Sequence, residues 1–214
     1  MSLARRIESI ARYSAYVRIV VLISGSGTLL QALIEASADP KYGVTIAAVG
    51  ADRPGIAGLD RAKAAGIDTF VHKLSDFDTR EQWDKALTET VREYQPDLVV
   101  SAGFLKLFGP HFLANFDQRA INTHPSLLPA FPGIHAPQDA LNYGVRFTGC
   151  TLFIIDSGVD TGQVLDQRVV PVLPDDTVDT LHERIKVQER ELLVTVVRGI
   201  ADGSIPLKRK ASTP

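Results

Sequence analysis

The first hundred residues alternate between short apolar runs and longer amphipathic stretches. Apolar runs rich in β-branched residues occupy residues 17–24, 44–50, 67–73 and 96–103, as expected for buried parallel strands. Between them, residues 27–38, 55–66 and 79–95 place apolar positions at helical spacing, and Thr79 is a suitable N-cap for the last of these helices. The alternation predicts an open α/β sheet.

The second half of the chain departs from this alternation. A short strand is predicted at residues 119–125 and a helix at 136–144, ended by Gly144. Two further strands, 149–156 and 163–172, are joined by a loop without a helix, which favours an antiparallel pairing. Residues 177–203 predict a long terminal helix, in one or two pieces, that begins at Thr177. We therefore expect an α/β fold with an open, mainly parallel Rossmann-like sheet, helices on both faces and an antiparallel C-terminal addition.

No repeat or low-complexity linker divides the chain, so we expect one domain over residues 17–205. Residues 1–16 form an N-terminal extension, interpreted as an extra helix or a mobile segment. A targeting signal is disfavoured because Glu8 interrupts the basic pattern and no secretory apolar region follows. Residues 206–214 form a basic tail.

Composition narrows the class of protein. The 214 residues are 45% hydrophobic and 22% charged, with a net charge of −2, so a substantial core is expected and neither nucleic acid nor a membrane is a predicted partner. No apolar run reaches the length of a membrane span. A single cysteine, Cys150, fits a reducing compartment, and we predict a cytoplasmic location.

A glycine-rich turn follows the first predicted strand. Gly25, Ser26, Gly27 and Thr28 lie between that strand and a helix, where backbone amides and the helix N-terminus can hold a phosphate. An ordinary strand–helix turn is the alternative. Leu30 replaces the third glycine of a dinucleotide fingerprint, although Asp52 lies where a ribose-binding acid could be. The turn therefore favours a single phosphate over a dinucleotide.

Asn122 and His124 end a later strand, two positions apart, so both face the same side of it. An amide can donate to a developing oxyanion, and an imidazole can transfer a proton near neutral pH. Asp156 and Asp160 follow another buried strand, and a carboxylate near His124 would favour the imidazolium. The alternative is that both aspartates only cap turns.

Other reactive side chains give weaker signals. Cys150 is flanked by strand residues and is interpreted as core, and Glu189 as part of an exposed helix face. The remaining histidines are dispersed, and neither a Cys pair nor an H-E-x-x-H motif is present, so no metal site is predicted. These histidines are His72, His111, His135 and His182.

Four stretches in order, "VLISGSGTLLQALI", "SAGFLKLF", "INTHPSLLPAFPGIHA" and "DSGVDTGQVL", resemble the folate-dependent phosphoribosylglycinamide formyltransferase family over residues 17–204. The resemblance implies transfer of a formyl group from 10-formyltetrahydrofolate, as co-substrate, to the amine of glycinamide ribonucleotide in purine biosynthesis. The amine would attack the formyl carbon, and a tetrahedral oxyanion would then collapse. No metal is required for this chemistry.

The resemblance also implies roles for individual residues. Asn122 matches the amide at the oxyanion, His124 the general acid or charged stabiliser, and Asp160 the carboxylate beside the histidine. The ribonucleotide-binding positions are Gly27, Thr28, Leu29, Lys186, Val187, Gln188 and Glu189. The folate-binding positions are Arg80, Leu105, Lys106, Leu107, Phe108, Asn122, Asp156, Ser157, Gly158, Val159 and Asp160.

Three positions depart from the pattern expected of the family. Ser26 and Leu29 stand where asparagines are frequent, and Ala130 where a lysine is frequent. The main alternative function is formyltetrahydrofolate hydrolysis, although that relative usually has a further N-terminal domain. An NAD-dependent oxidoreductase and an inactive binding module are also considered. The missing glycine disfavours the first, and the intact Asn122–His124–Asp160 set disfavours the second. A homodimer is one expectation for the oligomeric state.

Overall fold

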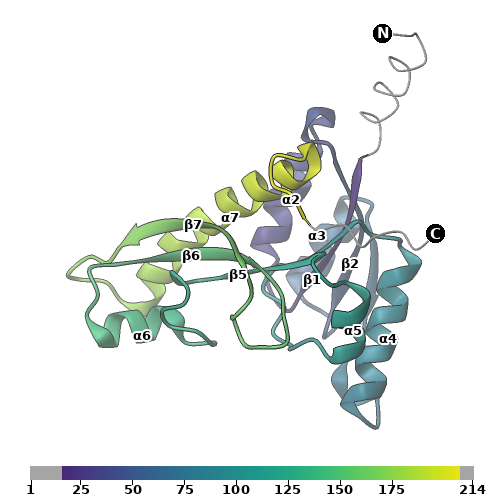
Figure 1. Ribbon diagram of the computed structural model, residues 1–214, viewed down its shortest axis with the longest axis horizontal. Coiled ribbons are helices and arrows are strands. Elements are labelled where there is room, and N and C mark those ends of the chain that lie inside the picture. Colours follow the sequence, from purple (N-terminus) through teal and green to yellow (C-terminus); the bar gives the residue numbers. More distant parts are fainter. Residues whose placement is uncertain (1–15, 208–214) are drawn as a thin grey trace.

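The computed structural model describes residues 16–207 as a single seven-stranded sheet flanked by helices (Figure 1). The strand order is β3-β2-β1-β4-β5-β6-β7. The first five strands along the chain pair in parallel, and β6 and β7 add in antiparallel orientation. The strands are β1 (Val17–Ile23), β2 (Val44–Ala51), β3 (Asp68–Val71), β4 (Leu98–Ser101), β5 (Ala120–His124), β6 (Phe147–Ile154) and β7 (Val164–Pro171).

Helices cover both faces of the sheet. Side chains of α2, α3 and α7 share one apolar cluster with the sheet, and side chains of α4 and α5 share the other. The helices are α2 (Thr28–Ser37), α3 (Ala57–Ala64), α4 (Arg80–Glu93), α5 (Pro110–Asn115), α6 (Ala136–Tyr143) and α7 (Val178–Asp202), with short 3₁₀ turns η1 (Pro40–Tyr42) and η2 (Leu74–Asp76).

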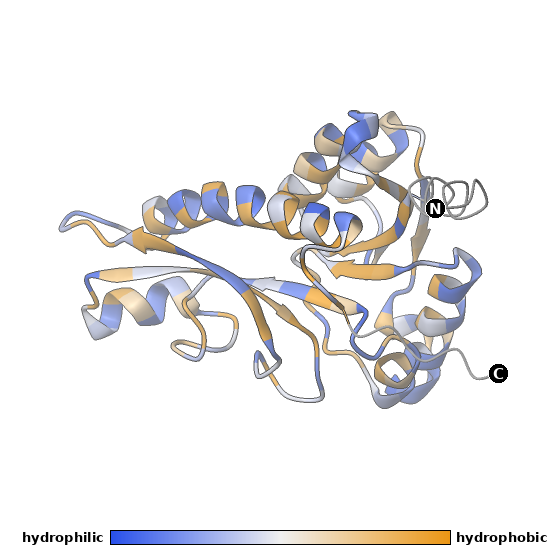
Figure 2. Cartoon of the chain, turned by 45° about the horizontal axis from the view of Figure 1, so that its top comes forward, coloured by the Kyte–Doolittle hydropathy of each residue, from blue (hydrophilic) through white to orange (hydrophobic). Residues whose placement is uncertain are grey.

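The sequence of strand β1 is continuously apolar because both faces of the strand are buried. Successive side chains of a strand point to opposite faces, so Ile19 and Val21 enter one core while Val20 and Leu22 enter the other. Each of these side chains is fully buried. Figure 2 shows hydrophobic strands at the centre and helices on which hydrophobic and hydrophilic residues alternate.

The predicted fold class is confirmed, including the antiparallel C-terminal addition. The terminal helix α7 is continuous, which is one of the two forms that the sequence left open, and it begins with a capping box between Thr177 and Thr180. One helix was missed. Helix α5 was not predicted, because it has only six residues and its apolar positions follow a Gly-Pro pair.

The domain boundaries of the sequence analysis stay predictions. The extension at residues 1–16 and the tail at 206–214 fall almost wholly outside the described residues 16–207. Within that range, none of the helices combines the length and the apolar character needed to cross a bilayer.

The strand order determines where a ligand can bind. Strand β1 lies between β2 and β4. The chain runs from β1 outward to β2 and β3, and then returns through α4 to β4 on the other side of β1. Such a switch point leaves a crevice beyond the carboxyl ends of the strands. Gly25, Gly103 and Asn122 lie at or just beyond the ends of β1, β4 and β5, as the sequence predicted.

Candidate active site

A cavity of about 530 Å³ opens at this crevice. Its walls come from four parts of the chain: the turn after β1, the segment after β4, the end of β5 with its following loop, and the loop after β6, with one face of α7 closing it. The lining comprises residues 24–29, 101–108, 122–125, 133–134, 153, 155–160, 182, 186 and 189.

Asn122 lies two residues before the end of β5, and His124 lies at its end. Both residues line the cavity. His124 is 4% exposed. Its Nε2 lies 2.8 Å from the carbonyl of Phe131, and its Nδ1 lies 3.4 Å from Asp160 Oδ2. Each ring nitrogen of His124 therefore faces an oxygen that can accept a hydrogen bond. The side chain of Asn122 makes no hydrogen bond within the described residues, so its amide is available to a ligand.

The two aspartates of the loop after β6 have different contacts. Asp156 accepts hydrogen bonds from the backbone N–H of Gly158 and the hydroxyl of Thr161, which is a turn-capping role. Asp160 reaches His124 and also accepts a 2.8 Å hydrogen bond from the N–H of Gly133. The capping alternative therefore describes Asp156, and the contact with His124 belongs to Asp160.

The loop after β5 is anchored by a buried hydroxyl. Thr151, on β6, donates to the carbonyl of Ser126 at 2.7 Å and accepts from the N–H of Leu128 at 3.0 Å. Gln167, on β7, donates both to Thr151 and to the Leu128 carbonyl. These bonds fix the loop whose Phe131 carbonyl faces His124.

Ala130 lies on the outer side of this loop. It lines a small apolar hollow of about 360 Å³ together with Leu127, Phe131 and Tyr143. Ala130 is itself exposed, and nothing in the structure explains why alanine stands at this position.

The glycine turn has the geometry of an anion site. Gly27 precedes α2 with a left-handed backbone at φ 70°, and no side chain caps the helix. The first-turn amides of α2 therefore lack side-chain partners beside the cavity. Arg61 supports the turn by donating to the Ser26 carbonyl at 3.0 Å. Leu30, at the third glycine position, is fully buried in the core.

Only part of the predicted 186–189 segment faces the cavity. Lys186 and Glu189, three positions apart on α7, line it together with His182. Val187 is 43% exposed, and the side chain of Gln188 donates to Glu191. Because the helix is unbroken through these residues, its rotation carries positions 187 and 188 away from positions 186 and 189.

Glu189 is buried, which differs from the exposed helix face expected from the sequence. Burial raises its pKa to about 7, and hydrogen bonding to Thr123 and the nearby Lys186 and Arg190 oppose this rise. The carboxyl group therefore changes charge close to neutral pH.

Residues 105–108 form the opposite wall, after β4. The N–H of Leu105 donates to Ser24 Oγ at 2.8 Å, and the guanidinium of Arg80 donates to the carbonyl of Leu107. Phe108 stacks between Phe104 and Phe112. Arg80 thus lies outside the cavity lining and contacts the back of this wall, with its guanidinium over the Trp83 ring.

Cys150 supports its earlier interpretation as a core residue. Cys150 is fully buried, and burial raises the pKa of its thiol to about 12, so it is a core residue. Within residues 16–207, no group of three or more His, Cys, Asp or Glu side chains could hold a metal ion.

Sequence reasoning missed several residues of the cavity. Ser24 and Thr123 are buried hydroxyls without a motif of their own. His182 precedes Lys186 by four positions and Glu189 by seven, and that helical spacing is the signal that could have identified it. Together the cavity offers a free amide, an imidazole held between two acceptors, an anion-binding helix end and an apolar wall. Such a set suits attack on a carbonyl carbon.

The comparisons with known proteins agree with this chemistry. The family model described as formyl transferase matches residues 17–197. Phosphoribosylglycinamide formyltransferase of Mycobacterium tuberculosis is 47% identical over 200 residues, covering 94% of this chain and 92% of the relative. The enzyme of that name from Escherichia coli is 38% identical over 194 residues, covering 91% and 92%. A crystal structure of glycinamide ribonucleotide transformylase 1 from Symbiobacterium toebii superposes with a TM-score of 0.86 at 40% identity, covering 89% of this chain and 90% of that one.

Proposed function

Since this chain belongs to the formyl transferase family, we propose that it transfers a formyl group from 10-formyltetrahydrofolate to the amine of glycinamide ribonucleotide. One observation carries the proposal: Asn122, His124 and Asp160 meet beside a cavity with an uncapped helix N-terminus at one side. The predicted catalytic residues and the predicted phosphate turn thus open into the same space.

Asn122 is proposed to stabilise the tetrahedral intermediate. Attack of the amine on the formyl carbon converts a carbonyl oxygen to an oxyanion, which needs a donor already in place. The Asn122 amide lines the cavity and has no competing partner among the described residues. Loss of one such donor typically lowers the turnover rate by about 10²–10³.

His124 is proposed to act as the cation and proton donor. Its ring is fixed by the Phe131 carbonyl and Asp160, and Asp160 stabilises the charged form. When the intermediate collapses, the leaving folate nitrogen takes up a proton, and an imidazolium beside it can supply that proton. The attacking amine loses one proton, which returns His124 to its charged form, so that no net proton is gained or lost in the transfer.

The two substrates are proposed to bind to different walls of the cavity. Gly27, Thr28 and Leu29 are proposed to hold the phosphate through backbone amides, with Lys186 and Glu189 on the sugar or glycinamide portion. Residues 105–108 and 156–160 are proposed to hold the pterin. The cytoplasmic location and the homodimer stay predictions.

One assay tests the function. Purified protein receives 10-formyltetrahydrofolate with or without glycinamide ribonucleotide, and tetrahydrofolate release is followed. Release is expected only with the ribonucleotide, together with formylated product. Release that is independent of the ribonucleotide would instead support the hydrolase alternative, although these three relatives carry transferase names.

A further inference from the structure

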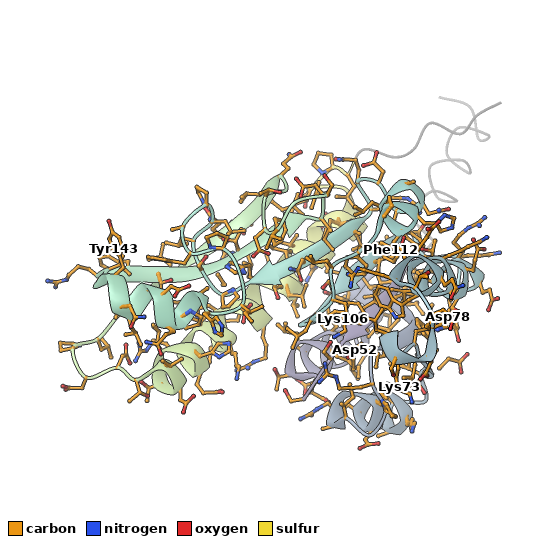
Figure 3. All side chains as sticks on the ribbon, turned by 90° about the horizontal axis from the view of Figure 1, so that it is seen from below. Asp52, Lys73, Asp78, Lys106, Phe112 and Tyr143 are labelled. Carbon is orange, nitrogen blue, oxygen red and sulfur yellow. The ribbon has the colours of Figure 1, made fainter. Side chains whose placement is uncertain are left out.

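Four basic side chains line the cavity, namely Lys106, His124, His182 and Lys186. The two lysines are already paired. The Lys106 ammonium lies 3.1 Å from Asp52, in the bend that follows β2, and Figure 3 shows these two side chains next to each other. The Lys186 ammonium lies 2.6 Å from Glu183, three positions earlier on α7. The charge of each lysine is therefore balanced by a carboxylate of the protein itself.

The two histidines differ in the same respect. The ring of His124 has an acceptor at each nitrogen. The ring of His182 is partly buried and makes no hydrogen bond or ion pair within the described part of the chain. Burial lowers the pKa of His182, and the charge of Lys186 lowers it further. Glu183 and Asp179 oppose this shift. Near neutral pH the ring is therefore mainly neutral, with one N–H donor that has no partner.

Helix α7 places its cavity-lining side chains along one line. His182, Lys186 and Glu189 are four and three positions apart, so they share one face of the helix. Glu189 marks the end of the line that is nearest to the chemistry, because it hydrogen-bonds Thr123, which lies between the two proposed catalytic residues of β5. His182 lies at the other end, about 10 Å away along the helix axis.

The proposed ribonucleotide has a length that matches this line. Its amine and its phosphate are joined through the glycinamide and the ribose, and bonds of about 1.5 Å place the two groups roughly 9 Å apart. With the amine beside β5, the phosphate lies toward the His182 end. The turn at residues 25–29 lines the same cavity, and α2, which begins there, packs directly against α7. One phosphate can therefore contact the first amides of α2 and the His182 ring together.

We propose that His182 is a specificity residue that donates a ring N–H to the phosphate of the ribonucleotide, beside the backbone amides at the start of α2. A hydrogen bond to a charged phosphate is stronger than one to a neutral acceptor, and His182 breaks no bond within the protein to make it. Lys186, by contrast, shares its charge with Glu183. The inference rests on the proposed function, because it assumes that the ribonucleotide occupies this side of the cavity.

The first test compares the acceptor with and without its phosphate. Wild type, His182→Leu and His182→Gln are assayed with glycinamide ribonucleotide and with the glycinamide ribonucleoside, at saturating formyl donor. We expect His182→Leu to raise the KM of the ribonucleotide about tenfold, the size of one charge-assisted hydrogen bond, with kcat unchanged. The KM of the ribonucleoside should not change. His182→Gln keeps an N–H donor and should restore most of the affinity for the ribonucleotide.

His111→Leu is the matched control. His111 lies on α5, outside the cavity lining, and its side chain is 39% exposed, so the same substitution there should change neither KM. Equal rises in KM for the ribonucleotide and the ribonucleoside would mean that His182 only shapes the cavity. A fall in kcat with unchanged KM would mean that His182 acts in the chemical step. Either result would overturn the proposal.

Direct binding separates this inference from the proposed function. Ribose 5-phosphate and ribose are titrated into wild type and His182→Leu by calorimetry, without formyl donor or turnover. Binding of ribose 5-phosphate that is about tenfold weaker in the variant supports the phosphate contact even if the transfer assay fails. Equal affinity of the two proteins contradicts the contact even if transfer succeeds, and so does a wild type that does not prefer ribose 5-phosphate to ribose.

Discussion

At the scale of single residues, backbone conformation separates two aspartates that the sequence presents as equivalent. Asp160 has φ 56°, in the left-handed region, which Asp and Asn tolerate better than most residues. This turn directs its carboxylate to His124 and the Gly133 N–H. Asp156, four residues earlier, bonds only within its own turn.

Asp160→Asn should abolish most activity without unfolding the protein. Asparagine tolerates the left-handed backbone conformation and keeps an oxygen that can accept from the Gly133 N–H. It removes the negative charge beside His124. We expect kcat to fall by at least about 100-fold, the usual scale for a proton-transfer group. The measurement is steady-state turnover with saturating substrates. Urea midpoints of wild type and variant provide the control, and near-normal kcat would remove Asp160 from the mechanism.

Glu189 affects stability in a pH-dependent way. Its pKa is raised by burial to about 7 in the folded protein, so folding favours the protonated carboxyl. The stabilisation is complete below the ordinary pKa of glutamate, about 4.3, and is lost as pH rises through about 7. At higher pH the folded state holds a buried charge.

Glu189→Gln should therefore be more stable than wild type at alkaline pH. The neutral amide avoids the buried charge, and we expect a gain on the order of 2 kcal/mol at about pH 9 that disappears at about pH 4. Urea denaturation at both pH values measures the difference. A pH-independent difference would contradict the ionisation and indicate a packing effect.

The sequence could place Asn122 and His124 together at one strand end, because residues two apart on a strand face the same side. It could not identify the environment of Glu189, because a charged residue among charged neighbours on a helix is usually solvated. Burial of Glu189 depends on β5 approaching α7, through Thr123, and this contact joins residues that lie far apart in the chain.

At the scale of elements, one side chain determines the start of the short helix α5. Asp84, within α4, is 1% exposed. Its carboxylate accepts from the N–H groups of Gly109 and His111 at 2.8 and 2.9 Å, and from Phe112 at 3.3 Å. A side chain at Gly109 would lie 2.4 Å from Asp84 Cγ. The Gly-Pro pair therefore allows α5 to begin directly on the carboxylate of α4.

Asp84→Ala should destabilise the protein by about 3 kcal/mol, because three buried backbone donors lose their acceptor. Chemical denaturation measures this loss. Asp78→Ala, at an exposed position just before α4, is the control and should stay within about 0.5 kcal/mol of wild type. Equal stability of the two variants would contradict the capping role.

The turn after β1 also depends on a contact between elements. A Cβ on Gly27 would lie 2.6 Å from Gly58 Cα, at the start of α3, and the backbone of Gly27 is left-handed. The first glycine of the motif is different: a Cβ on Gly25 would meet nothing within 4 Å, and its φ is not positive. Substitution of Gly27 therefore changes the packing of α2 on α3 as well as the phosphate site.

Gly27→Ala should cost about 2 kcal/mol or more, from backbone strain and the clash with α3. Gly25→Ala should change stability by less than about 1 kcal/mol. Thermal denaturation of both variants tests the difference. If the two variants have the same melting temperature, the close contact between α2 and α3 does not contribute to stability.

The elements themselves were largely predictable, because long apolar runs and helix caps are local signals. As expected, Thr79 caps the N-terminus of α4, where its side chain accepts a hydrogen bond from the backbone N–H of Gln82. Gly144 ends α6 with a left-handed backbone at φ 81°. Helix α5 could not be predicted in the same way. Its start depends on Asp84, twenty-five residues earlier, and not on a local pattern.

At the scale of the whole molecule, the open sheet ends in two edge strands, β3 and β7. Unpaired backbone groups on an edge can pair with another chain. On β7 the backbone N–H of Gln167 donates to Asp166 Oδ1 at 2.8 Å, and its carbonyl accepts from Arg168 Nη1 at 3.2 Å. Asp166 and Arg168 also pair with each other at 3.0 Å. The flanking charges therefore occupy both hydrogen-bonding groups of Gln167.

The double variant Asp166→Ala/Arg168→Ala should associate more readily through β7. It frees the N–H and carbonyl of Gln167 and leaves apolar side chains around them, including Val169, which is 61% exposed. We expect the association constant in sedimentation velocity to rise about tenfold, the effect of about 1.4 kcal/mol. The matched control is Glu89→Ala/Arg92→Ala, which removes an exposed ion pair from α4 with the same change in charge. If both double variants associate like wild type, the ion pair on β7 does not protect the edge, and Pro171 at the end of the strand is sufficient.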